Sequence, residues 1–232
     1  MTSWALAGAS AGAGGVLGTL LQAWLARRYS TDAFVAGPDD PPEPNEPPPA
    51  NPFLRPRTLA CCLAGAVACG AAIGALGFSV ESLRTAALWM VLVQLVAIET
   101  DSWLHPKPLS VGGLCLALLL ASVQGRKALV EAMVAAVLVW IGVMLLGFFG
   151  RIFHKETIGG GLPLTMAMVG AFVAGSSLQT VVIAAAVFTG VLGILTARRT
   201  GESGEIPTSP GLMFGVAVAT LPWASLWSLL QG

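Results

Sequence analysis

Eight apolar stretches, separated by charges and turn residues, constrain what this chain can fold into. They fall near residues 4–25, 58–78, 84–100, 109–123, 128–149, 162–177, 180–197 and 210–230. Each is long enough, or nearly so, to cross a bilayer core as a helix, which takes about 20 residues. Helices are expected because lipid offers no partner to an unpaired backbone group. We therefore predict an all-α, polytopic membrane helix bundle of about eight transmembrane helices, forming one membrane domain over residues 1–232.

Composition supports a membrane protein and gives no sign of a nucleic-acid partner. Hydrophobic residues make up 55% of the chain and charged residues only 10%, far from the balance of a soluble domain. The 12 basic and 12 acidic residues cancel, so no basic surface for nucleic acid is expected. Residues 4–25 lack a preceding basic segment and a following cleavage site, so we expect a retained helix rather than a signal peptide. The expected surroundings are membrane lipid.

The distribution of lysine and arginine predicts the orientation. One set of loops carries most of the basic residues, namely Arg27, Arg28, Arg55, Arg57, Lys107, Arg151, Lys155, Arg198 and Arg199. The opposite set carries Arg84, Arg126 and Lys127. By the positive-inside rule the first set is cytoplasmic. A multi-pass protein with both termini outside is therefore predicted.

The longest loop, residues 29–57, is rich in proline and poor in apolar residues. Such a segment cannot bury enough apolar surface to pack, and proline disfavours helix and sheet. We predict an extended cytoplasmic linker between the first and second helices. A proline-rich ligand for a partner domain is an alternative that the composition does not require.

Cysteine and histidine give no metal-site pattern. The four cysteines lie inside apolar stretches and are expected to be small packing residues: Cys61, Cys62, Cys69 and Cys115. His105 has no second histidine, cysteine or carboxylate at ligand spacing. His154, beside Lys155 and Glu156, is expected in a wet cytoplasmic loop. We predict no metal and no cofactor.

Two acids stand at the end of the third apolar stretch, Glu99 and Asp101. An acid there can be an interfacial side chain near water, or a functional group if it faces the bundle interior. Two residues are about 200° apart around a helix, so at most one of these acids points inward. Position alone leaves both interpretations of Asp101 open.

Three consecutive glycines, Gly159 to Gly161, precede the apolar run from Leu162 to Gly175. Glycines allow a sharp bend or the close approach of another group, and here they stand at the mouth of a predicted membrane segment. Such a bend is often only a turn. The rest of the chain decides whether this one does more.

Several of these segments together resemble the type IV prepilin peptidase family, membrane-embedded aspartic peptidases with a G-x-G-D motif. That family has an Asp at the cytoplasmic end of a helix and a Pro seven residues later, a spacing matched by Asp101 and Pro108. The glycines of its G-x-G-D-x-K-L run and of the residues after it are matched by Gly159, Gly161, Gly170 and Gly175.

The resemblance extends to both ends of the chain. Arg27 and Arg28 close the first span as basic residues do in the family, and residues 205–212 resemble the segment that opens its last helix. The resemblance implies a bacterial or archaeal cell (inner) membrane. It also implies pilin-like precursors, or secretion and pilus assembly proteins, as partners.

The chain departs from the family pattern at its second acid. Leu162 stands where the family has its second catalytic Asp, and Leu164 where it has Lys. The cysteine-bearing insert, which the resemblance associates with zinc and N-methylation, is also absent. Aspartic peptidase chemistry needs one ionised and one protonated carboxyl group, and leucine supplies neither. The resemblance thus implies a peptidase-like protein with lost or impaired endopeptidase activity, in which Asp101 is alone.

Two alternatives remain. Glu156, six residues before Leu162, could fold back and supply the second acid of an active peptidase that cuts prepilin leaders at the cytoplasmic face. The other alternative is a non-enzymatic, transporter-like or scaffold bundle in which Asp101 couples transport. That alternative needs polar residues along a path, for which the apolar stretches offer Gln94 and Gln179.

Overall fold

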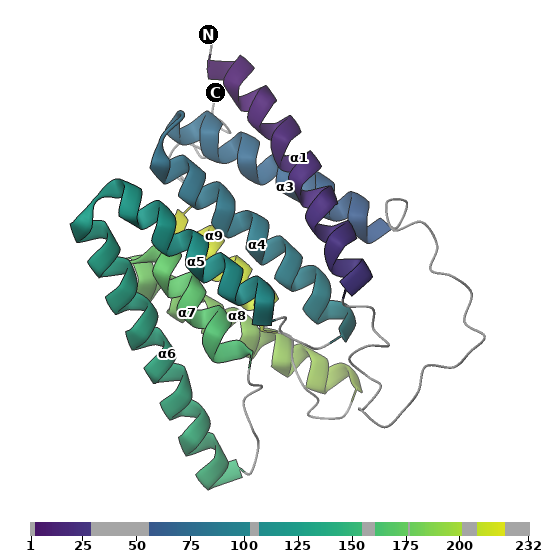
Figure 1. Cartoon of the computed structure of the whole chain (residues 1–232). Helices are drawn as coiled ribbons and strands as arrows, with labels where there is room; N and C mark the ends of the chain where they lie inside the picture. Colours follow the sequence, from purple (N-terminus) through teal and green to yellow (C-terminus); the bar gives the residue numbers. More distant parts are fainter. Residues whose placement is uncertain are drawn as a thin grey trace, which may run out of the picture. The chain divides into compact units, whose positions relative to one another are not determined.

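The computed structural model is helical throughout its described residues, which are 3–28, 56–102, 107–154, 161–175, 177–200 and 208–220. These residues hold eight α-helices and no strand (Figure 1). The helices are α1 (Ser3–Arg28), α3 (Pro56–Leu76), α4 (Val80–Ser102), α5 (Lys107–Gln124), α6 (Arg126–His154), α7 (Leu162–Val173), α8 (Ser177–Thr200) and α9 (Ser209–Thr220). Each predicted apolar stretch overlaps one helix, and the helices follow the same order along the chain. The prediction of an all-α fold is confirmed.

Four of these helices are long and apolar enough to cross a membrane: α4, α5, α6 and α8. The apolar part of α3, Thr58–Gly74, is shorter, and α7 and α9 each have 12 described residues. Several helices of this length and hydrophobicity are typical of an integral membrane protein. The number of crossings and the orientation of the termini stay predictions, and most of the predicted linker, 29–55, lies outside the described residues.

Most described helices begin or end a few residues away from the ends of the apolar stretches, and two of these differences bear on the predictions. Helix α6 continues past the predicted end at residue 149 to His154. The prediction of a loop at His154 is therefore wrong, because backbone hydrogen bonds can continue a helix beyond its apolar part. Helix α7 ends at Val173, since Ala174 and Gly175 have positive φ angles of 29° and 76°. Positive φ angles leave the helical conformation, and the backbone N–H of Ala174 makes the last hydrogen bond, to the Gly170 carbonyl oxygen.

The chain divides into two compact units, residues 1–104 and residues 105–232. In the first unit, α1 and α3 pack closely along their lengths, and α4 packs mainly against α3. Glycine makes the close approach possible. A Cβ atom on Gly14 would lie 2.5 Å from the carbonyl oxygen of Gly65, and one on Gly65 would lie 2.7 Å from that of Gly14. Small residues at such contacts let two helix backbones meet.

In the second unit, α7 packs against both α5 and α6, and α8 packs against α9. Met168 and Ala171 of α7 are fully buried, so this short helix is the most enclosed element of the unit. Its Gly170 lies against α6, where a Cβ atom would be 3.1 Å from the carbonyl oxygen of Ala135. Between α8 and α9 the rings of Phe188 and Phe214 stack with centroids 4.5 Å apart.

Candidate functional site

The end of α4, in the first unit, carries two of the candidate residues, Glu99 and Asp101. The helix continues to Ser102, so Glu99 and Asp101 belong to one unbroken helix, about 200° apart around its axis. Glu99 is only 3% exposed. The side chain of Asp101 lies outside the described residues. Of the two acids, Glu99 is therefore the one whose burial the structure establishes.

Other polar side chains are buried in the same unit. Gln94 is fully buried and donates a hydrogen bond through Nε2 to the carbonyl oxygen of Gly18, at 3.2 Å. Its Oε1 atom has no hydrogen-bond partner among the described residues. Gln22 is 2% exposed, and its Oε1 lies 3.8 Å from the Cys61 thiol, which donates to it. Side-chain hydrogen bonds therefore link α1 to both α3 and α4.

Glu99 is a site candidate that the sequence analysis set aside. The seven-residue spacing to a proline, which pointed to Asp101 and Pro108, holds equally for Glu99 and Pro106. The signal was thus present in the sequence but did not distinguish the two acids. The burial of Glu99 is the additional observation that makes it a candidate functional residue of α4.

The start of α7, in the second unit, carries the other candidate segment, Gly161 and Leu162. Gly161 is buried and forms the N-cap of this helix, with φ −85° and ψ −27°. Leu162 is the first residue of the helix and is half-buried. Pro163 follows it, at a position where the missing N–H group costs the helix no hydrogen bond. The first turn, which the structure describes completely, contains no acidic residue.

A pair of hydroxyl groups connects this turn to α5. The Ser110 and Thr165 hydroxyl oxygens are 2.8 Å apart, and both residues are fully buried. Thr165 also donates to the Gly161 carbonyl oxygen from its backbone N–H at 3.0 Å and from its hydroxyl at 3.2 Å. The start of α7 is therefore held by neutral hydrogen bonds. No sequence motif pointed to this pair, whose members are 55 residues apart.

Pro108 has a structural reason for its position. It is the second residue of α5 and is exposed, so it stands where proline is well tolerated in a helix. Ser110, two residues later, makes the contact to Thr165. The structure thus brings together the starts of α5 and α7. Gly159 and Glu156 lie outside the described residues, so their proposed roles stay predictions.

The described cysteines and histidines do not gather into a metal site. No group of three or more metal-ligating side chains occurs in the described part of the chain. Cys61 is buried, as expected of a packing residue. Cys115 is exposed, so the expectation that it packs in a core is wrong. Of the two glutamines considered for a polar path, Gln94 is buried and Gln179 is exposed.

Comparison with known proteins supports the resemblance read from the sequence. A 129-residue part of the chain, 55% of its length, is 30% identical to the prepilin leader peptidase/N-methyltransferase of Myxococcus xanthus. The chain is similar to a prepilin leader peptidase. The matched part spans 38% of the Myxococcus peptidase, so the chain corresponds to less than half of that protein. No protein-family model and no solved structure matches the chain.

Proposed function

We propose that this chain is a prepilin leader peptidase-like integral membrane protein that binds pilin-like precursors and has lost or impaired endopeptidase activity. Leu162 carries the proposal, because it is the first residue of α7 and follows Gly161 in the position of the family's second catalytic Asp. A carboxylate would suit this position, since the N-terminus of a helix favours negative charge. Leucine can neither accept nor donate a proton.

Without a second acid, the protein can fold but cannot hydrolyse an amide bond by the aspartic peptidase mechanism. Amide hydrolysis by this class needs one carboxylate to take a proton from water and one carboxylic acid to donate to the carbonyl oxygen. Glu99 and Asp101 both belong to the end of α4, about 200° apart, so at most one of them faces a given site. A single carboxylate at that site cannot provide both roles.

The location of binding follows from the predicted orientation. The end of α4 and the start of α7 both adjoin loops that the positive-inside rule assigns to the cytoplasm. We therefore place the site at the cytoplasmic face of a bacterial or archaeal cell (inner) membrane, in a single membrane domain with both termini outside. The partners are pilin-like precursors or the proteins of secretion and pilus assembly. The segment before α3, residues 29–55, is the proposed cytoplasmic linker; residues 56 and 57 of the predicted linker belong to α3.

The proposal is tested by asking whether the protein binds a pilin precursor without cleaving it. The purified full-length protein in nanodiscs is incubated with a fluorescent pilin precursor, and both binding and leader removal are measured. We expect saturable binding, weakened by Asp101→Ala or Glu99→Ala, and no leader removal. Leader removal by the wild-type protein that Glu156→Gln abolishes would instead establish the active alternative. Absence of saturable binding would refute the proposed partner.

A second variant asks whether Leu162 alone accounts for the missing activity. Leu162→Asp restores an acid at the first residue of α7, and leader removal by this variant would show that the remaining site is intact. If Leu162→Asp binds the precursor but does not cut it, more of the site than one residue has changed.

A further inference from the structure

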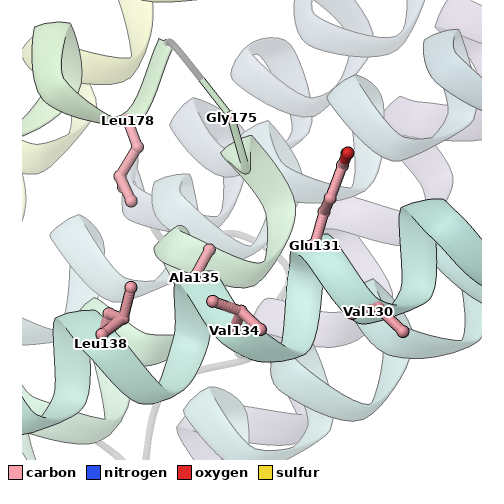
Figure 2. Close-up of a pocket in the computed structure, with 7 residues that line it drawn as sticks. All are labelled: Val130, Glu131, Val134, Ala135, Leu138, Gly175 and Leu178. Carbon is pink, nitrogen blue, oxygen red and sulfur yellow. The ribbon is translucent and has the colours of Figure 1, made fainter.

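A hollow of about 320 Å³ opens on the surface of the second unit, beside the turn at Gly175 that follows α7 (Figure 2). Most of its lining comes from α6, and the rest comes from the turn between α7 and α8 and the start of α8. The lining residues are Val130, Glu131, Val134, Ala135, Leu138, Gly175 and Leu178. All except Glu131 are apolar, so the hollow is an aliphatic groove with one carboxylate.

Small residues keep this groove open. Gly175 has a φ angle of 76°, which other residues rarely adopt, and a Cβ atom on it would meet no atom within 4 Å. Ala135 contributes only a methyl group. In Figure 2 Leu178 reaches from α8 toward α6, while Glu131 extends toward the turn at Gly175. The backbone that ends α7 therefore also leaves space beside α6.

The two ends of the groove differ in chemistry. Glu131 stands on the second turn of α6, and Lys127, one turn earlier, has its ammonium 3.9 Å from the Glu131 carboxylate. Both side chains are accessible, with 92% of Lys127 and 53% of Glu131 exposed. Leu138 lies about 10 Å further along the helix. One end is thus charged, and the other is aliphatic.

Water is a poor occupant of such a groove. The hollow is open on one side, and among its lining side chains only the Glu131 carboxylate can bind water, so its aliphatic part suits hydrocarbon better. Helix α6 is also apolar enough to cross a membrane, with only 22% of its apolar window buried in the structure. The groove therefore faces an environment in which hydrocarbon chains are available.

We propose that this groove binds a phospholipid with a primary-ammonium head group. An acyl chain lies against Val134, Leu138 and Leu178. The head-group ammonium donates hydrogen bonds to the Glu131 carboxylate, and the phosphate accepts from the Lys127 ammonium. A neighbouring carboxylate and ammonium match a zwitterionic head group in both signs of charge. A choline head group has no N–H donor, so the groove distinguishes phosphatidylethanolamine from phosphatidylcholine.

Native mass spectrometry of the full-length protein tests this selectivity. Protein released from nanodiscs with equal amounts of phosphatidylethanolamine, phosphatidylcholine and phosphatidylglycerol should retain the ethanolamine lipid preferentially. Glu131→Gln should lower that preference about fivefold, the effect of one interfacial charge of about 1 kcal/mol. Glu81→Gln, which removes an exposed carboxylate in the first turn of α4, is the matched control and should leave it unchanged.

A second variant tests the aliphatic end. Leu138→Trp should fill the groove and reduce lipid retention, whereas Val137→Trp, on a neighbouring exposed position outside the lining, should not. Equal retention of ethanolamine and choline lipids would overturn the proposal, as would preference for phosphatidylglycerol.

The molecule that occupies the groove can be identified by an independent experiment, photo-crosslinking. A photo-crosslinking amino acid at Val134, activated in nanodiscs with added pilin precursor, should form an adduct with the mass of a phospholipid. An adduct with the precursor or with a second copy of the chain would overturn the proposal, because the groove would then be a protein-binding surface.

Discussion

The end of α4 and the start of α7, the two segments that the resemblance singles out, differ in their polar residues. The end of α4 keeps its acids and buries Glu99 at 3% exposure, in a unit where Gln94 and Gln22 are also buried. The start of α7 has Leu162 as its first residue and no acid in its first turn, and it is held by the hydroxyl pair of Ser110 and Thr165. The N-cap at Gly161 and the start of the helix therefore form without a carboxylate in that turn.

The two segments also differ in the free energy that it costs to bury their side chains. Burying a carboxyl group or an amide costs free energy unless hydrogen bonds compensate, so polar residues retained inside a membrane bundle indicate a function or a specific register. A half-buried leucine has no such cost. The first unit therefore keeps an arrangement that packing alone does not require, whereas the start of α7 has the composition of a structural element.

The largest expected effect is on the packing of the first unit. Gly14→Ala places a methyl group 2.5 Å from the Gly65 carbonyl oxygen, so α1 and α3 must move apart. We expect a loss of about 2–3 kcal/mol in unfolding free energy, measured in mixed micelles. Gly12→Ala is the control, because its Cβ would meet nothing within 4 Å. Equal stability of the two variants would show that the described α1–α3 contact is wrong.

A smaller effect is expected at the start of α7. Ser110→Ala removes the hydrogen bond to Thr165 but leaves the bonds of Thr165 to Gly161. A loss of about 1 kcal/mol should result, within the range measured for hydrogen bonds between membrane helices. Ser122→Ala, which removes an exposed hydroxyl bonded within α5, should be close to neutral. A neutral Ser110→Ala would mean that packing alone holds α7 to α5.

The smallest effect is expected at Gln94. Gln94→Met removes the hydrogen bond to the Gly18 carbonyl oxygen but also removes an Oε1 atom that has no described partner. These changes oppose each other, so we expect a loss of only about 0.6 kcal/mol. Gln179→Met, at an exposed position of α8, serves as the control. A large loss at Gln94 would indicate that its Oε1 is hydrogen-bonded in the membrane.

The existence and order of the helices could be predicted from the sequence, because long apolar stretches in lipid have few alternatives to a helix. The helix ends could be predicted less well. Helix α6 continues through Arg151 to His154, and α7 ends early because Ala174 and Gly175 adopt positive φ angles. Both depend on local backbone conformation rather than on hydrophobicity.

The candidate site could be predicted in part. The spacing to a proline identified the end of α4 but fitted both Glu99 and Asp101, and only the packed structure shows that Glu99 is buried. The contact between Ser110 and Thr165 joins residues 55 positions apart, and no local pattern encodes such a pairing. Sequence therefore indicated the segments, whereas packing identified individual side chains.

The measurement that tests the central claim most directly is leader removal by the wild-type protein. Full-length protein in nanodiscs is incubated with a pilin precursor, and products are followed by mass spectrometry beside a variant carrying both Glu99→Ala and Asp101→Ala. If Leu162 replaces the second catalytic acid, as we propose, the wild-type protein should release no more leader than the variant. Leader release by the wild-type protein that the double variant lacks would contradict this account.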